Sequence, residues 1–591
     1  MSASVHLRRS RSDRRSVRRA TFVRCCVPWL ALLAGACEKP AADSSVANET
    51  PAAAADTSPP ANPLPKTGGA ESKPAGQTTR RSQVPTANPG KVPFTISKET
   101  TYVTEPLRAD GLPDYAAALD AMAGEGVTPE NNAVVSYWRA IGPRAIDPSL
   151  RSDYFAKLEM EVPPEKGEYL VGLKVFAEEL AARRGASPHE QSAVIEQVRN
   201  QQERAARAPW RETDLPWIAE WLRRNEKPLR LVEEGTRRPH YFAPTIIPQT
   251  KEGEPPAPMI EALLPLLLEV RDMSRLLAVR AMLRLAEGRP EECTADLLTC
   301  RRLGRQVAHG WTFIDQLVGF AIEEIAMEGE KALAGHSGLS ASDALRHIAE
   351  LDRIPATRGI VSALDGGERF IFLSIICHTS LYGLGMFADE DGDASLGESP
   401  LNQALTGGAI EWDVPLKMGN ELCDELAAVA GAAHYGDRQR LLADFESRFN
   451  RKQAELNDTE SVRARMARDA SETVGELLVL LLAPATRSAV AAEDRSRMQL
   501  DLSRLAFALA AYHSERGEYP AALAALAPKY LSAVSEDIFS GGSLIYRRTA
   551  DRRGCVLYSV GPNGADDGGM LPEEGPFSDD LVVRMSPSAR E

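Results

Sequence analysis

Residues 276–307 read LLAVRAMLRLAEGRPEECTADLLTCRRLGRQV, two runs of apolar residues at helical spacing with a short break between them. Apolar residues three and four positions apart are typical of an amphipathic helix that buries one face. Gly288 is suited to end the first helix, because glycine readily adopts the left-handed backbone that follows many helices. Pro290 is suited to the first turn of the second helix, where its missing N–H costs no hydrogen bond. The stretch therefore predicts an antiparallel helical hairpin.

Outward from this hairpin, helical spacing extends over residues 93–494, which we expect to form a helical body. Thr128 and Pro129 predict the start of one helix, with threonine as its cap and proline in its first turn. The run LLVLLLA at 477–483 is too short to span a bilayer, so it predicts a buried helix or a helix junction. Strand-like runs appear only after about residue 535. The predicted fold class is mainly α, a large helical bundle or hairpin body followed by a small α+β module.

The first 37 residues have the pattern of an export signal. Residues 1–36 hold eight arginines against one acid, Asp13, and they end in the apolar stretch CCVPWLALLAGA at 25–36. A helix of that length would span roughly 18 Å, which is well short of the ~30 Å hydrocarbon core of a bilayer. The segment therefore predicts a secretory signal rather than a spanning helix.

The sequence LAGAC at 33–37 resembles a bacterial lipobox. The resemblance implies that Cys37 is lipidated and anchors the exported protein to a membrane, on the periplasmic side of the cell envelope. The sequence departs from the pattern at Ala34, where a bulky aliphatic residue is usual. The alternative is ordinary signal-peptide cleavage without a lipid.

Residues 38–92 are rich in Ala, Pro, Ser and Thr and contain few large apolar residues. Such a segment cannot bury enough surface to offset its ordering entropy, so we expect a disordered tether. Residues 1–36 carry +7, and the net charge of the whole chain is −14, so the rest carries −21. Nucleic-acid binders use clustered lysine and arginine to neutralise phosphates, so nucleic acid is not an expected partner.

Cysteine and histidine do not form a recognisable reactive site in the sequence. Five cysteines remain beyond the signal, and we expect them to be buried free thiols: Cys293, Cys300, Cys377, Cys423 and Cys555. Cys377 and His378 are adjacent, but consecutive residues of a helix point about 100° apart, so no catalytic dyad is expected. The sequence therefore predicts no catalytic residue.

Two acidic clusters resemble metal sites, and for both we favour a solvated surface. Glu323 and Glu324, with Asp315 upstream, could face a bundle interior as in di-metal proteins, but no Glu-x-x-His motif accompanies them. Residues 389–400 resemble the first half of an EF-hand loop. However, Ala394 and Pro400 stand where that loop requires glycine and glutamate.

Residues 495–591 predict a separate α+β module. The run RMQLDLSRLAFALAAYHSERG at 497–517 has helical spacing and ends in Gly517, which is suited to cap a helix. The runs LIY at 544–546 and VLY at 556–558 are strand-like, and turn residues at 551–554 separate them. Together these runs predict a β-hairpin after the helix.

The order of the motifs AYHSERGEYP, LAPKYL, DIFSGGSLIYR and LYSVGPNGADDGG resembles the globular part of the type II secretion major pseudopilins. From about residue 104 the chain also resembles an uncharacterised family of large exported bacterial proteins that end in this module. A true pseudopilin begins with a cleavable leader and a long apolar helix, whereas a signal, a tether and a helical body come first here. Polymerisation into a pilus is therefore not expected.

The resemblance to pseudopilins implies a calcium ion in the carboxy-terminal loop. Calcium takes six to eight oxygen ligands from carboxylates, amides and carbonyls. The side chains that could supply them are those of Asp537, Ser559, Asn563, Asp566 and Asp567. The alternative is a plain turn at residues 563–564 with solvated aspartates.

These features predict an envelope-tethered helical interaction or scaffold protein, with protein partners in the envelope and a lipid anchor in the membrane. One alternative is an exported hydrolase with a carboxylate site in the helical body. Another is an accessory protein of a secretion system. The tether of residues 38–92 would hold the folded body away from the membrane.

The lipobox resemblance makes a direct prediction about Cys37. The Cys37→Ala variant should lose membrane association in fractionated envelopes, because no lipid can be attached, while the wild type should partition with the membrane. Ala34→Leu, which restores the usual residue, should leave the wild-type partition unchanged. Equal partition of Cys37→Ala and wild type would contradict lipidation at this cysteine.

Overall fold

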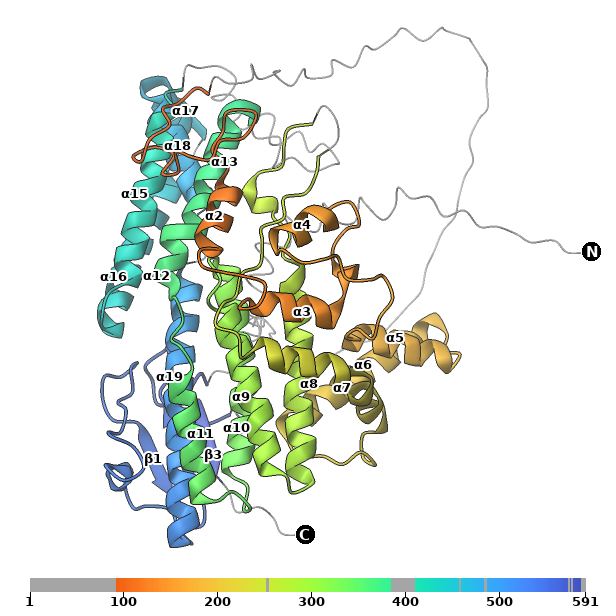
Figure 1. Ribbon diagram of the computed structural model, residues 1–591. Helices are drawn as coiled ribbons and strands as arrows, with labels where there is room; N and C mark the ends of the chain where they lie inside the picture. The colour runs from red at the N-terminus through yellow and green to blue at the C-terminus, as the bar shows by residue number, and fades with distance from the viewer. Residues whose placement is uncertain are drawn as a thin grey trace, which may run out of the picture. The chain divides into compact units, whose positions relative to one another are not determined.

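The computed structural model describes residues 92–250, 254–383, 410–456, 459–482, 486–571, 574 and 578–585. All of them belong to one compact unit, Asn88–Glu591. The predicted signal (residues 1–37), nearly all of the predicted tether and the acidic loop at 389–400 lie outside the described residues. The described part is mainly helical with a small antiparallel sheet, which confirms the broad fold class (Figure 1).

The order of the elements agrees with a helical body followed by a short stretch of strands. The helices are α2 (Tyr115–Ala123), α3 (Ala133–Ile141), α4 (Arg151–Lys157), α5 (Leu173–Arg183), α6 (Pro188–Arg207), α7 (Pro216–Gly235), α8 (Pro265–Ala286), α9 (Pro290–Val307), α10 (Phe313–Ala334), α11 (Ala341–Arg353), α12 (Ile360–Ala363), α13 (Arg369–Tyr382), α15 (Asp413–Ala430), α16 (Tyr435–Leu456), α17 (Thr459–Arg468), α18 (Ala470–Leu482) and α19 (Thr486–Arg516). A π-helical turn, Leu364–Glu368, joins α12 to α13. The strands are β1 (Ile545–Arg548), β2 (Cys555–Ser559) and β3 (Leu581–Met585).

The helical hairpin predicted from residues 276–307 is present as α8 and α9. Gly288 has a φ of +73° between them, and Pro290 is the first residue of α9. Helix α10 packs along α9 at close range, because a Cβ atom added at Gly304 would lie 2.9 Å from the Gly319 carbonyl oxygen. A Cβ atom at Gly319 would lie 2.5 Å from the Ala308 backbone nitrogen. Helices α9 and α10 therefore depend on glycine at their crossing.

The prediction that a helix begins at Thr128–Pro129 was wrong. Helix α3 begins at Ala133, and Asn132 caps it by accepting a hydrogen bond from the Val134 N–H at 3.1 Å. The Asn132 side chain also accepts from the Phe242 N–H and donates to the Phe242 carbonyl. This tertiary contact with a segment 110 residues away favours asparagine as the cap and leaves Thr128 in the preceding turn.

A buried ion-pair network joins α9, α10 and α19. The Arg301 guanidinium donates to Glu330 at 3.0 and 2.7 Å and lies 3.6 Å from Glu323. The same guanidinium donates to the Ser503 hydroxyl of α19 at 2.9 Å. Ser496 of α19 donates to Glu323 at 3.2 Å. Five side chains from three helices are therefore linked around one buried cation, and we call this set (Arg301, Glu323, Glu330, Ser496 and Ser503) the Arg301 network.

Glu323 was expected on a solvated helical face, and this prediction was wrong. Its side chain is only 1% exposed and also accepts from Arg305 at 2.6 Å. Burial alone would raise the pKa of Glu330, but the nearby Arg301 guanidinium and His347 lower it overall, well below the ordinary value. Two arginines therefore make the burial of these carboxylates tolerable.

Helix α19 is continuous across residues 494–495, where the sequence analysis set the boundary between body and module. It contacts α10 and α11 of the body, which lie beside it in Figure 1. Gly517 follows it with a φ of +75°, and its N–H donates to the His513 carbonyl, as predicted for the cap. One apolar core includes Ile322 of α10, Leu505 of α19 and Leu557 of β2.

The predicted hairpin is formed by β1 and β2, which pair antiparallel with Ile545 opposite Tyr558. A third strand, β3, pairs antiparallel with β2 and was not predicted. Its burial comes from tertiary contact, since α10 and α19 both contact β3. The LLVLLLA run lies largely in α18, as a helix with Leu478 buried. Within the described residues, none of the helices combines the length and the apolar character that a membrane span requires.

The Arg301 network predicts a large difference between two neighbouring arginines. Arg301→Met should lower the free energy of unfolding by about 3–5 kcal/mol, because Glu323 and Glu330 lose their shared partner inside the core. Arg302→Met removes only a half-exposed pair with Glu350 and should cost under about 1 kcal/mol. Denaturant unfolding at pH 7 measures both. Equal losses for the two variants would contradict the assignment.

Candidate functional site

The structure separates the five predicted calcium ligands into two groups. Asp537 and Ser559 form the first group, in which the Asp537 carboxylate accepts from the Ser559 hydroxyl at 2.8 Å and from the Phe539 N–H at 3.0 Å. Its second oxygen accepts from the Val560 N–H at 3.0 Å. Asp537 is 1% exposed, so its carboxylate serves to join the turn after it to the end of β2.

The second group lies in the exposed loop after β2 and consists of Asn563, Asp566 and Asp567. Asn563 donates from its side-chain amide to Asp567 at 3.2 Å. Asp566 accepts from the Gly568 N–H and from the Tyr558 hydroxyl, both at 2.9 Å. These two donors lower the pKa of Asp566, with the backbone N–H as the larger cause. The loop therefore brings three of the predicted residues together.

The sequence analysis missed two further acids of this loop, Asp579 and Asp580. Asp579 accepts from the Asn563 N–H at 2.9 Å, and Asp580 accepts from the Gly569 N–H at 2.8 Å. The other carboxylate oxygen of each is buried and has no hydrogen-bond partner among the described residues. Burial raises the pKa of both, and the charge of Asp567 raises them further. The sequence signal that could have identified Asp579 and Asp580 is that two adjacent acids directly precede β3.

The loop thus gathers negative charge and unused oxygens, which is chemistry that a hard cation satisfies. The described residues nevertheless contain no group of three or more histidine, cysteine or acidic side chains placed to hold a metal ion. Asp537 already accepts hydrogen bonds at both oxygens. The predicted set of five therefore is not assembled as one ligand shell, and the unused oxygens belong to Asp579 and Asp580.

A second carboxyl pair, Asp315 and Glu368, lies at the start of α10. Asp315 accepts from the Thr312 hydroxyl at 2.7 Å and completes a capping box. Glu368, in the π-helical turn, accepts from the Phe313 N–H at 2.7 Å. Burial raises the pKa of Asp315 to about 6 and that of Glu368 to about 7, with Asp315 adding to the second shift. These bonds give both acids a structural function at the helix start.

The five cysteines are free and buried, as predicted. Burial raises the pKa of Cys377, Cys423 and Cys555 to about 12, so these thiols are neutral near pH 7. His378 contacts the Pro256 carbonyl at 3.0 Å, and the Cys377 sulfur lies 3.7 Å from the Tyr115 hydroxyl. The two side chains therefore have different partners.

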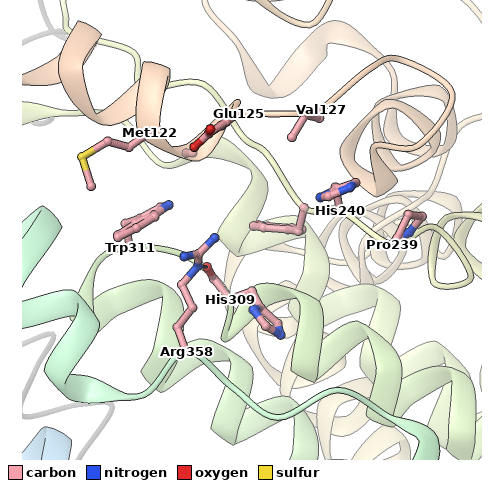
Figure 2. Close-up of a pocket in the computed structure, with 10 residues that line it drawn as sticks. Met122, Glu125, Val127, Pro239, His240, His309, Trp311 and Arg358 are labelled. Carbon is pink, nitrogen blue, oxygen red and sulfur yellow. Dashed lines mark hydrogen bonds between the residues drawn. The ribbon is translucent and has the colours of Figure 1, made fainter.

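A cavity of about 390 Å³ opens in the helical body, and none of its lining residues was singled out by the sequence (Figure 2). The segment after α2 and the segment after α7 form part of its wall. The turn between α9 and α10 contributes His309 and Trp311, and the turn between α11 and α12 contributes Arg358. Residues far apart in sequence meet there, which is why no local motif marks it.

Comparisons of the chain with protein-family models, with curated proteins and with solved structures found no match.

Proposed function

We propose that this protein is an exported, envelope-tethered helical interaction protein whose pseudopilin-like carboxy-terminal module is a rigidly held docking domain. The observation that carries the proposal is the apolar core shared by α10, α19 and β2. A module that shares its core with the body cannot reorient without unfolding. Its acidic loop is therefore held at a constant position on the helical body.

Further contacts support this rigid attachment. Arg438 of α16 and Asp494 of α19 form an ion pair in which both side chains are buried. His347 of α11 stacks on Phe507 of α19, with ring centroids 3.9 Å apart. These contacts lie on both sides of residue 495, so the whole length of α19 is bound to the body.

The loop itself is also held by the body. The Tyr435 hydroxyl of α16 donates to the Pro562 carbonyl at 2.8 Å. The Tyr435 ring packs edge-on against Phe539, with centroids 4.9 Å apart. A preorganised loop binds with a smaller entropic cost than a free one. This arrangement favours docking over a mere stabilising cap.

The charge of the loop indicates the kind of partner. Asp566 is exposed, Asp567 is half-buried, and the two lie together in the loop, so a protein surface rich in lysine or arginine would complement them. We further propose that a calcium ion binds in this loop at the unused carboxylate oxygen of Asp580, with main-chain carbonyls and water as its other ligands. A nucleic-acid partner remains disfavoured by the acidic body.

The two alternatives are supported unequally. An exported hydrolase would need free carboxylates, whereas the hydrogen bonds of Asp315 and Glu368 assign both to the start of α10. An accessory role in a secretion system agrees with the resemblance to pseudopilins and is one form of the docking proposal.

Photo-crosslinking from the loop tests the docking proposal. A benzophenone amino acid at the exposed position Ala565 should yield a discrete crosslinked product in native envelopes, and the same label at exposed Asn200 on α6 should not. The double variant Asp566→Asn, Asp567→Asn should abolish the product, because the complementary charge is lost. A product that survives this double variant, or the same product from both labels, would sink the proposal.

Calcium is tested by melting the full-length protein in millimolar calcium and then in chelator. Binding to the folded state alone should add roughly 2.7 kcal/mol at a hundredfold excess over the dissociation constant. Asp580→Asn should remove this gain, whereas Asp551→Asn, in the exposed turn between β1 and β2, should keep it. An unchanged melting temperature in the wild type would eliminate the ion.

A further inference from the structure

The cavity in the helical body is lined by an arginine, Arg358, that is stacked on an aromatic ring. The Arg358 guanidinium lies over the Trp311 ring, 4.0 Å from its centroid, and donates through Nε to the His309 carbonyl at 2.9 Å. No ion pair to Arg358 occurs in the part of the chain that the structure describes. Arg305, which also lies near His309, differs because it pairs with Glu323. The Nη groups of Arg358 remain as donors beside the cavity.

The Trp311 ring on which Arg358 stacks is itself fixed by close packing against the π-helical turn. A Cβ atom at Gly366 would lie 2.8 Å from the indole, so the π-helical turn packs closely against that ring. Figure 2 shows the guanidinium next to Trp311, with Glu125 on the opposite wall. A cation stacked on a rigid aromatic ring loses little further entropy when it binds an anion.

Two polar side chains of the wall, His309 and Tyr241, are uncharged at pH 7. Burial lowers the pKa of His309, and the charges of Arg358 and Arg305 lower it further, so its imidazole is uncharged at pH 7. Tyr241 also lines the cavity, and its buried hydroxyl has no hydrogen-bond partner among the described residues. The cavity therefore offers one cation, Arg358, across from one carboxylate, Glu125.

Part of the wall is apolar and partly open to solvent. Met122, beside Trp311, is 41% exposed, and Val127 and Pro239 line the cavity at its other end. A cavity of about 390 Å³ lies within the range of roughly 300–1,000 Å³ that is usual for small-molecule sites. Its mixture of one cation with apolar and aromatic surface fits an amphipathic anion.

We propose that this cavity binds a small organic acid, with the carboxylate on Arg358 and the apolar body against Trp311 and Met122. The planar guanidinium matches a carboxylate through two parallel hydrogen bonds. A dianionic phosphate fits less well, because Arg358 is the single cationic side chain among the lining residues and Glu125 faces it. This site is separate from the carboxy-terminal loop and does not depend on the docking proposal.

Benzoate and benzamide test the proposal, because they share a shape and differ in charge. Titration of the full-length protein, followed by calorimetry or ligand-observed NMR, should show saturable benzoate binding and at least roughly tenfold weaker benzamide binding. Arg358→Gln should abolish the preference for benzoate. Arg358→Lys should retain part of it, because the charge remains but the planar fork is lost.

Arg353→Gln is the matched control, since Arg353 is 73% exposed and pairs with Glu350 outside the cavity. It should bind benzoate as the wild type does, and the melting temperature of each variant should report an intact fold. Equal affinity for benzoate and benzamide would overturn the proposal, as would unchanged benzoate binding by Arg358→Gln. Inorganic phosphate should compete only weakly for the cavity. If phosphate bound the protein more tightly than benzoate does in a competition titration, the choice of a carboxylate ligand would be overturned.

Discussion

The pairing of Arg301 with Glu323 and Glu330 is the interaction on which the rest of the described structure depends. All three side chains are at most 2% exposed, so their charges are removed from water at a cost of several kcal/mol each. Their mutual bonds offset that cost only when α9 and α10 stand in one register. Ser496 and Ser503 extend the same requirement to α19. An apolar core could hold these helices together, but it would not specify their alignment as strictly.

This alignment has consequences at both ends of α9 and α10. Near the crossing of the two helices, the turn between them carries His309 and Trp311, which form part of the cavity with Arg358. Elsewhere in the unit, β2 and β3 enter the same apolar core as α10 and α19. A candidate ligand site and a candidate docking loop are therefore built on one rigid helical layer. Their separation along the chain allows the two proposals to be tested independently.

The sequence predicted features that depend on neighbours along the chain. The α8–α9 hairpin and the cap at Gly517 follow from helical spacing and from the backbone freedom of glycine. Features set by distant partners were missed. Glu323 looks solvated in sequence because Arg301 and Arg305 lie on another helix, and Asn132 is selected as a cap by a contact with Phe242. Arg358 and Trp311 have no shared motif, and β3 is separated from β2 by residues 560–580, so no short turn marks it as the next strand of a hairpin.

Hydrogen exchange of the wild-type protein tests most directly whether body and module form one rigid unit. The compared peptides come from β2 and from α19 before and after residue 495. Their amides should exchange with one common free energy of opening, and their protection should be lost at the same denaturant concentration. That outcome is required if one core and the Arg301 network hold all three. The account would be contradicted if the amides of β2 and of the carboxy-terminal half of α19 exchanged while those of the amino-terminal half of α19 stayed protected.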